Sequence, residues 1–163
     1  MLNAKFGIEI EFTGITREKA AKVAAKFLEG KYIEGGTYYD VKKVKVPDGR
    51  IWEFVYDGSI RTQVSRNGRR VNANRDYSVE IVSPILTYRK DIDTLQELVR
   101  RIRKAGAFTN SSCGVHIHLD GSPHTPRSIR NFVNIIASRN DLFYKALEIK
   151  NERMRYCKRM DDI

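Results

Sequence analysis

The sequence has few cysteines and no run of apolar residues long enough to cross a membrane. Cys113 and Cys157 are too few for a disulfide framework and lack the paired spacing of a structural zinc site. A membrane span needs roughly 18–20 consecutive apolar residues. The chain also begins with a charged, strand-like segment where a signal peptide would have its apolar core. We therefore expect reduced thiols and a soluble, cytoplasmic protein with no membrane partner.

Acidic residues are also in the minority. The 163 residues include 30 lysines and arginines against 20 acidic residues, a formal charge of +10. This balance favours anionic partners, which include nucleic acid, nucleoside triphosphates, acidic peptides and membrane headgroups. Many basic residues also serve only to solvate a surface, so charge alone does not choose a partner. With 41% hydrophobic residues, the chain can bury one core, and we expect a single domain over residues 1–163.

The hydrophobic periodicity predicts alternating strands and helices. Thr16 is placed to cap the first helix and Gly30 to end it. We expect strands at 5–13, 37–46, 50–56, 77–86 and 114–120, and helices at 16–30, 89–105 and 127–149, the last broken near 140–141. Pro84 suggests an edge strand or a strand end. The order fits an α+β fold in which helices cover one face of a mainly antiparallel sheet.

The segment 61–75 is rich in basic residues and poor in apolar ones. The segment contains no acidic residue and five arginines: Arg61, Arg66, Arg69, Arg70 and Arg75. Such a composition cannot bury itself, so we expect a mobile loop that could act as a lid.

Two strands carry pairs of polar side chains on one face. Glu9 and Glu11 alternate with apolar residues, which points both carboxylates into the same space. A hard divalent cation such as Mg²⁺ could lie between them, although two solvated carboxylates on an exposed face would produce the same pattern. His116 and His118 share a strand face in the same way, and imidazoles can bind a metal or phosphate. One buried and one surface histidine is the alternative.

Two further acidic positions stand out. Glu80 is the acidic residue of an otherwise uncharged strand, where an isolated carboxylate would be costly to desolvate without a metal or an arginine beside it. A salt bridge is the structural alternative. Asp57, Gly58 and Ser59 follow the expected hairpin and could form an ordinary turn. Three separate strands would thus present acid or imidazole groups from one face, and this convergence strengthens each signal.

Four motifs occur in an order that resembles the amidoligase family, which is often found in phage and bacterial gene clusters. They are FGIEIEF at 6–12, DGSI at 57–60, EIVSP at 80–84 and CGVHIHL at 113–119. The resemblance implies a fold related to glutamine synthetase and glutamate-cysteine ligase, whose sheets bind divalent ions under the phosphates of ATP. A domain of that family would continue beyond the last helix, so we expect the fold to be incomplete at the C-terminus.

The resemblance also implies roles for individual residues. Glu9, Glu11, Glu80 and His116 correspond to metal-binding residues, and His118 would approach the nucleotide phosphates. Asp57 and Ser59 would act in catalysis on the substrate side. The arginine-rich segment would complete the phosphate clamp, and we assign Arg70 to catalysis and Arg66, Arg69 and Arg75 to nucleotide binding.

The function implied is an ATP-dependent ligase that joins a carboxylate to an amine through an acyl phosphate, with Mg²⁺ or Mn²⁺ as cofactor. Its partners would be ATP, a carboxylate substrate and an amine substrate. A peptide or a protein could serve as one of these substrates. One alternative is a metal-dependent hydrolase that uses the same glutamates and histidines. Others are a basic nucleic-acid-binding domain, which we rank below the ligase, and an enzyme with Cys113 as nucleophile, for which no orienting acid is evident.

Overall fold

The computed structural model describes residues 3–35, 40–149 and 151–160. The chain forms two compact units, which divide after Leu119. Each unit has its own helices, and we describe the two separately. The first unit contains the sheet and the two helices that cover it, and the motifs singled out above all lie within it.

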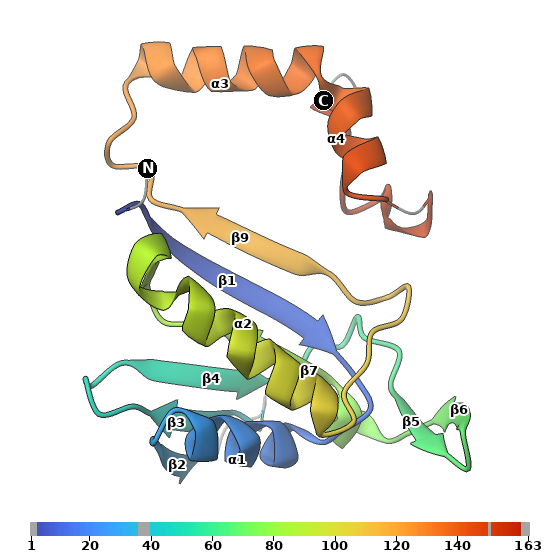
Figure 1. Cartoon of the computed structure of the whole chain (residues 1–163). Helices are drawn as coiled ribbons and strands as arrows, with labels where there is room; N and C mark the ends of the chain where they lie inside the picture. The colour runs from blue at the N-terminus through green and yellow to red at the C-terminus, as the bar shows by residue number, and fades with distance from the viewer. Residues whose placement is uncertain (1–2, 36–39, 150, 161–163) are drawn as a thin grey trace. The chain divides into compact units, whose positions relative to one another are not determined.

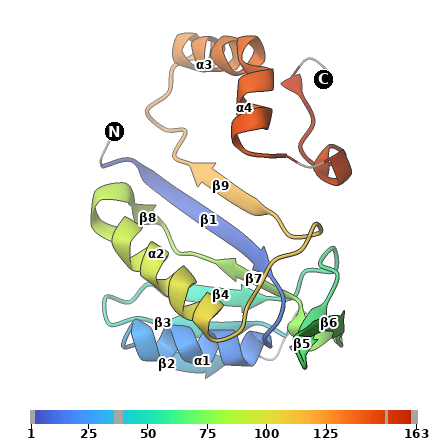
Figure 2. The same ribbon diagram turned by 45° about the vertical axis from the view of Figure 1, so that its right-hand side comes forward.

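Seven strands of the first unit form an antiparallel sheet: β1 (Lys5–Phe12), β2 (Lys31–Glu34), β3 (Lys42–Lys45), β4 (Ile51–Val55), β7 (Val79–Val82), β8 (Leu86–Thr87) and β9 (Val115–Leu119). The order is β2-β3-β4-β7-β1, and β8 pairs with the first residues of β1. Phe6 pairs with both Leu86 and Leu119, so β9 lies on the opposite side of β1 from β7 and β8. β1 therefore lies between β9 on one side and β7 and β8 on the other, as Figure 2 shows.

Helices α1 (Arg17–Phe27) and α2 (Tyr88–Lys104) cover one face of this sheet, as Figure 1 shows. Thr16 caps α1 by accepting a hydrogen bond from the N–H of Lys19. α2 buries Leu95, Leu98 and Ile102 on one stripe, which is the helical spacing that its sequence predicts. Both predicted helices and the α+β class with a mainly antiparallel sheet are confirmed.

The hydrophobic core lies between the helices and the sheet. Phe54 and Val44 project from the sheet into a cluster with Leu98 of α2, and all three are fully buried. On β1, the side chains of Phe6, Ile8 and Ile10 pack against the same cluster. Because side chains alternate along a strand, the glutamates of β1 must project from the opposite face. Core packing thus determines which face of the sheet carries the charged groups.

The expectation that 61–75 is an irregular loop is wrong. This segment forms a two-stranded hairpin, β5 (Gln63–Arg66) and β6 (Arg69–Asn72), followed by a 3₁₀ turn, η1 (Arg75–Tyr77). Asn67 and Gly68 connect the strands, both with positive φ, as an Asn-Gly hairpin turn requires. The carbonyl of Gln63 also accepts hydrogen bonds from Gly14 N–H and the Thr13 hydroxyl. The Asn-Gly turn and the backbone hydrogen bonds to Gln63 can hold two strands together even though these strands bury little apolar surface, and the composition of the segment does not reveal this.

Smaller differences concern strand boundaries. The predicted hairpin is present as β3 and β4, and residues 37–39 of its first strand lie outside the described residues. β2, which the sequence analysis did not predict, pairs with β3. The single strand expected at 77–86 is divided into β7 and β8 around Pro84, which confirms that a strand ends near this proline.

The second unit contains α3 (Pro126–Ser138), α4 (Asn140–Ala146) and a 3₁₀ turn, η2 (Asn151–Arg153). Thr125 and Ser128 form a capping box at the start of α3. The helices meet at Arg139, which confirms the predicted break. None of the helices in the described part of the chain is both long and apolar enough to cross a membrane.

Candidate metal centre

The strand register brings the predicted polar residues to one face of the sheet. On β1 and β7, Glu11 pairs with Glu80, and on β1 and β9, Glu9 pairs with His116. His118 pairs with Gly7, two residues before Glu9. Directly paired residues of antiparallel strands project to the same side. All five side chains therefore share the face opposite the helices.

Three carboxylates converge near the C-terminal end of β1. Glu11, Asp57 and Glu80 each offer one carboxylate oxygen, and these oxygens lie within 4.8 Å of one another. Glu11 is buried, and its Oε2 accepts a hydrogen bond from the N–H of Gly114 at 2.7 Å. Asp57 comes from the loop two residues after β4. We refer to Glu11, Asp57 and Glu80 as the carboxylate cluster.

Two imidazoles lie beside the cluster and are linked to it by Glu9. The Nδ1 of His116 lies 3.3 Å from Glu9 Oε2, and the Nε2 of His118 lies 3.2 Å from Glu9 Oε1. The other ring nitrogen of His116, Nε2, lies 3.7 Å from Glu11 Oε1. Glu9 therefore orients both rings, and His116 bridges Glu9 and Glu11.

The crowding of carboxylates changes the acidity of Glu80. Burial, followed by the charges of Glu9, Asp57 and Glu11, raises the pKa of Glu80 from 4.5 to about 7. Glu80 is thus near its point of half-protonation at neutral pH. A divalent cation would remove this repulsion, and the available donors are carboxylate oxygens, which Mg²⁺ and Mn²⁺ prefer. The residues present fit such an ion.

The DGS motif forms a tight turn that presents Asp57. The N–H of Ser59 donates to Asp57 Oδ1 at 2.7 Å, and the Ser59 hydroxyl donates to Asp57 Oδ2 at 3.1 Å. The sequence analysis placed both residues on the substrate side. The structure brings Asp57 into the carboxylate cluster, and Ser59, which is exposed, contacts the cluster residue Asp57 through these two hydrogen bonds. The DGS motif identified Asp57 from the sequence, but only the folded structure shows that Glu11 and Glu80 are its neighbours.

The arginines of the segment 61–75 lie in different places. Arg66 and Arg69 pair with each other on either side of the hairpin turn and are exposed. Arg70 stacks on the Phe108 ring at 4.4 Å and borders a hollow with Ile10 and Phe12. It therefore lies beside the core-facing side of β1, whereas the carboxylates project from the other face.

Arg75 is the remaining arginine of the predicted phosphate clamp. Its guanidinium carbon lies 4.3 Å from the centroid of the Tyr56 ring. Tyr56 directly precedes Asp57 in the chain. Of the four predicted clamp residues, Arg75 thus contacts the residue that directly precedes Asp57.

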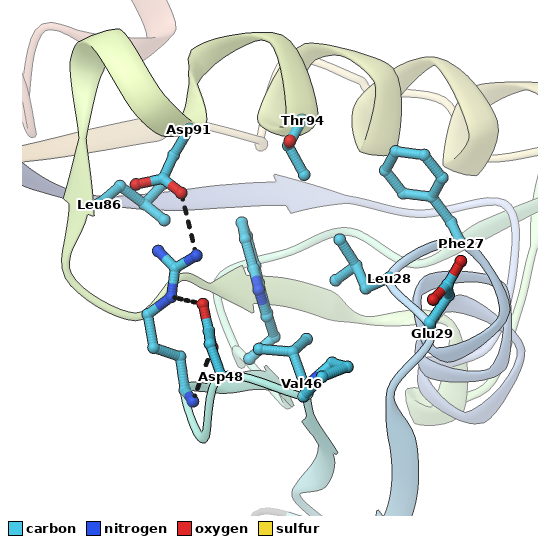
Figure 3. A pocket seen from close by; sticks show the side chains of 11 residues that line it. Phe27, Leu28, Glu29, Val46, Asp48, Leu86, Asp91 and Thr94 are labelled. Carbon is cyan, nitrogen blue, oxygen red and sulfur yellow. Dashed lines mark hydrogen bonds and ion pairs between the residues drawn. The ribbon is translucent and has the colours of Figure 1, made fainter.

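A hollow on the helix side of the sheet, shown in Figure 3, contains a second group of charges. There Arg50 bridges Asp48 and Asp91 at 2.8 and 2.9 Å. Burial raises the pKa of Asp91, but the bonds from Arg50 and from Thr87 N–H outweigh it, so the pKa falls below 3.8. The charges of Arg50, Asp48 and Asp91 are paired with one another, which indicates a structural ion-pair network.

Two residues with a direct bond to the site were not singled out from the sequence. Gly114, within the CGVHIHL motif, donates its N–H to Glu11. Ser78, just before β7, exchanges two hydrogen bonds with the backbone of Asp57. Neither a glycine before a strand nor a serine between strands has a distinctive sequence signal, so contact with the cluster is what identifies them.

Comparison with protein-family models gives one match. Residues 2–163 match the family described as "Putative amidoligase enzyme". No curated protein and no solved structure matches the chain. The matched region includes both units and every residue of the candidate metal centre.

Proposed function

The chain belongs to this amidoligase family, and from that premise we propose that it is an ATP-dependent carboxylate-amine ligase. The product would be an amide or isopeptide bond. The observation that carries the proposal is the convergence of three carboxylates within 4.8 Å, with the imidazole of His116 beside them, on the sheet face opposite the helices. Such a face can hold divalent ions and a triphosphate together.

In this proposal, Glu11, Asp57 and Glu80 hold Mg²⁺ or Mn²⁺. Glu9 and His116 complete the set of metal-binding residues. When bound, the ion neutralises the triphosphate and the charge that develops on the transferred phosphoryl group. The raised pKa of Glu80 supports this assignment, because a cation would favour the charged form that the neighbouring carboxylates now disfavour.

Glu9 sets the orientation of the imidazoles. If His116 carries its hydrogen on Nδ1 and donates it to Glu9, its Nε2 lone pair is free to act as a ligand on the side of Glu11. His118 is held by Glu9 through Nε2, and its Nδ1 can donate to a nucleotide phosphate when that nitrogen also carries a hydrogen. Glu9 thus orients both rings in addition to its proposed part in the metal site.

The proposed chemistry has two steps. A substrate carboxylate oxygen attacks the γ-phosphorus of ATP, and ADP leaves, which yields an acyl phosphate. The amine then attacks the acyl carbon, phosphate leaves, and the amine loses a proton to give the amide. The exposed Arg66, Arg69 and Arg75 remain our candidates for the nucleotide phosphates. Arg70 would need to leave Phe108 to take part.

Calorimetric titration of the full chain with the β,γ-imido analogue of ATP in the presence of Mg²⁺ tests the proposal. Glu80→Gln should weaken binding at least tenfold, as roughly expected when a ligand to a metal is lost. Glu53→Gln is the matched control, since Glu53 is on the same sheet face but pairs with Lys43 at 2.6 Å.

Binding that is unchanged in Glu80→Gln would refute the proposed site. Metal analysis of the purified protein provides a second check. Tightly retained zinc would favour the hydrolase over the ligase, and salt-dependent binding of DNA that ignores Glu80→Gln would favour the nucleic-acid-binding alternative.

A further inference from the structure

We propose that Arg17 is a positioning residue for the carboxylate cluster and that it acts through Ser78. The inference rests on the proposed function, in which the cluster binds a divalent cation. Arg17 lies in the first turn of α1, on the helix side of the sheet, and was not among the residues that the sequence motifs singled out. Its influence on the cluster would pass along a continuous chain of hydrogen bonds.

The guanidinium of Arg17 is 1% exposed and is surrounded by acceptors. Its Nη1 donates to two backbone carbonyls, that of Arg75 at 2.6 Å and that of Ser78 at 2.8 Å. Its Nε and Nη2 both donate to Asp40 Oδ2, at 3.2 and 2.7 Å. One side chain therefore fixes both ends of the turn η1, which leads directly into β7. Glu80 is the second residue of that strand.

Ser78 passes this restraint to Asp57. The Ser78 side chain is fully buried, and its hydroxyl donates to the carbonyl of Asp57 at 2.6 Å and accepts from the N–H of Asp57 at 3.0 Å. The pairing of β4 with β7 ends at Val55, so Asp57 lies beyond the strand ladder. The position of the Asp57 backbone consequently depends on a side chain, Ser78, whose own carbonyl is bound by Arg17.

The restraint matters because the cluster opposes its own assembly. Three carboxylates within 4.8 Å repel one another, and Asp57 is on a loop that can move away more easily than the strand residues Glu11 and Glu80. A buried guanidinium is also costly to desolvate unless its donors are satisfied. Arg17 satisfies Nε and Nη2 with Asp40, and it satisfies Nη1 with the backbone that leads to the cluster. The buried charge of Arg17 thus holds Asp57 close to Glu11 and Glu80 even when no cation is bound.

The competing explanation is that Arg17 only attaches α1 to η1. The same guanidinium offers the control, since its bonds to Asp40 support the fold but do not lead toward the cluster. Asp40→Asn should lower the Tm and leave cation affinity within twofold of wild type. Ser78→Ala removes both bonds to Asp57 and leaves Arg17 intact, so it tests the relay even if changes at Arg17 prevent folding.

The experiment measures Mn²⁺ affinity of the full chain from the electron paramagnetic resonance signal of free Mn²⁺, with folding checked by circular dichroism. Ser78→Ala and Arg17→Lys should each weaken Mn²⁺ binding about tenfold, as is typical for residues that orient metal ligands. The double variant should be little weaker than either single variant, because both changes break one chain of contacts.

The inference is overturned if folded Ser78→Ala binds Mn²⁺ like wild type, or if Asp40→Asn weakens binding as much as Arg17→Lys. These results would leave the proposed function intact, provided that Glu80→Gln abolishes Mn²⁺ binding. If wild type binds no Mn²⁺, or if Glu80→Gln binds it normally, the proposed metal centre itself fails and the inference fails with it.

Discussion

Replacing Glu80 with glutamine should stabilise the protein in the absence of metal ions, although it removes a proposed ligand. The pKa of Glu80 is raised from 4.5 to about 7 by burial and by the charges of Glu9, Asp57 and Glu11. The folded state therefore binds a proton that the unfolded state releases between pH 4.5 and 7. This contribution to stability is complete below pH 4.5 and is lost as the pH rises through 7.

The size of the effect follows from the shift. A rise in pKa from 4.5 to about 7 corresponds to about 3–4 kcal/mol at roughly 1.4 kcal/mol per pH unit. Because the side chain of Glu80 is only half-buried, solvent screening reduces this to about 1–2 kcal/mol. Glu80→Gln should therefore raise the Tm at pH 8 by roughly 2–8 °C, since about 1 kcal/mol shifts Tm by roughly 2–4 °C in a chain of this size.

The assay is thermal unfolding in EDTA at pH 4.5 and pH 8. At pH 4.5, where Glu80 is protonated in the folded state, the variant and wild type should agree within about 1 °C by the same scaling. Glu53→Gln is the control, because its carboxylate pairs with Lys43 and its loss should not stabilise the protein at either pH. A lower Tm of Glu80→Gln at pH 8, or an equal rise at both pH values, would refute the electrostatic reasoning.

Further predictions concern the fold that supports the site and can be checked by urea unfolding. Gly14 has φ of +96° and an added Cβ would lie 2.5 Å from the carbonyl oxygen of Gly106, so Gly14→Ala should cost at least about 3 kcal/mol. Gly49→Ala should cost only about 1 kcal/mol, because φ is +88° but the space around it is open; equal losses would contradict the contact argument. Thr16→Ala should cost about 1 kcal/mol through loss of the α1 cap, and a neutral result would show that the cap does not contribute.

Local patterns were sufficient for the parts of the fold that depend on one segment at a time. The alternation of apolar and acidic residues around Glu9 and Glu11 predicted both the strand and its two faces, because the side-chain period of a strand is two. The cap at Thr16 and the apolar stripe of α2 predicted the helices in the same way. The Asn67-Gly68 turn of the hairpin was also readable, but the arginines around it led to the wrong interpretation.

Contacts between distant segments decided the rest. The four motifs, the shared face of Glu9, Glu11, Glu80 and His116, and the family could all be predicted from the sequence alone. Strand register then decided that Glu11 is paired with Glu80 while Glu9 is paired with Val82 and His116.

The entry of Asp57 into the carboxylate cluster required the tertiary structure, as did the placing of Arg70 on Phe108 and the path from Arg17 through Ser78. The physical reason is that periodicity along one strand determines only the side to which a residue points. Its neighbours on that side come from strands and loops far away in sequence, and core packing and backbone hydrogen bonds set their alignment.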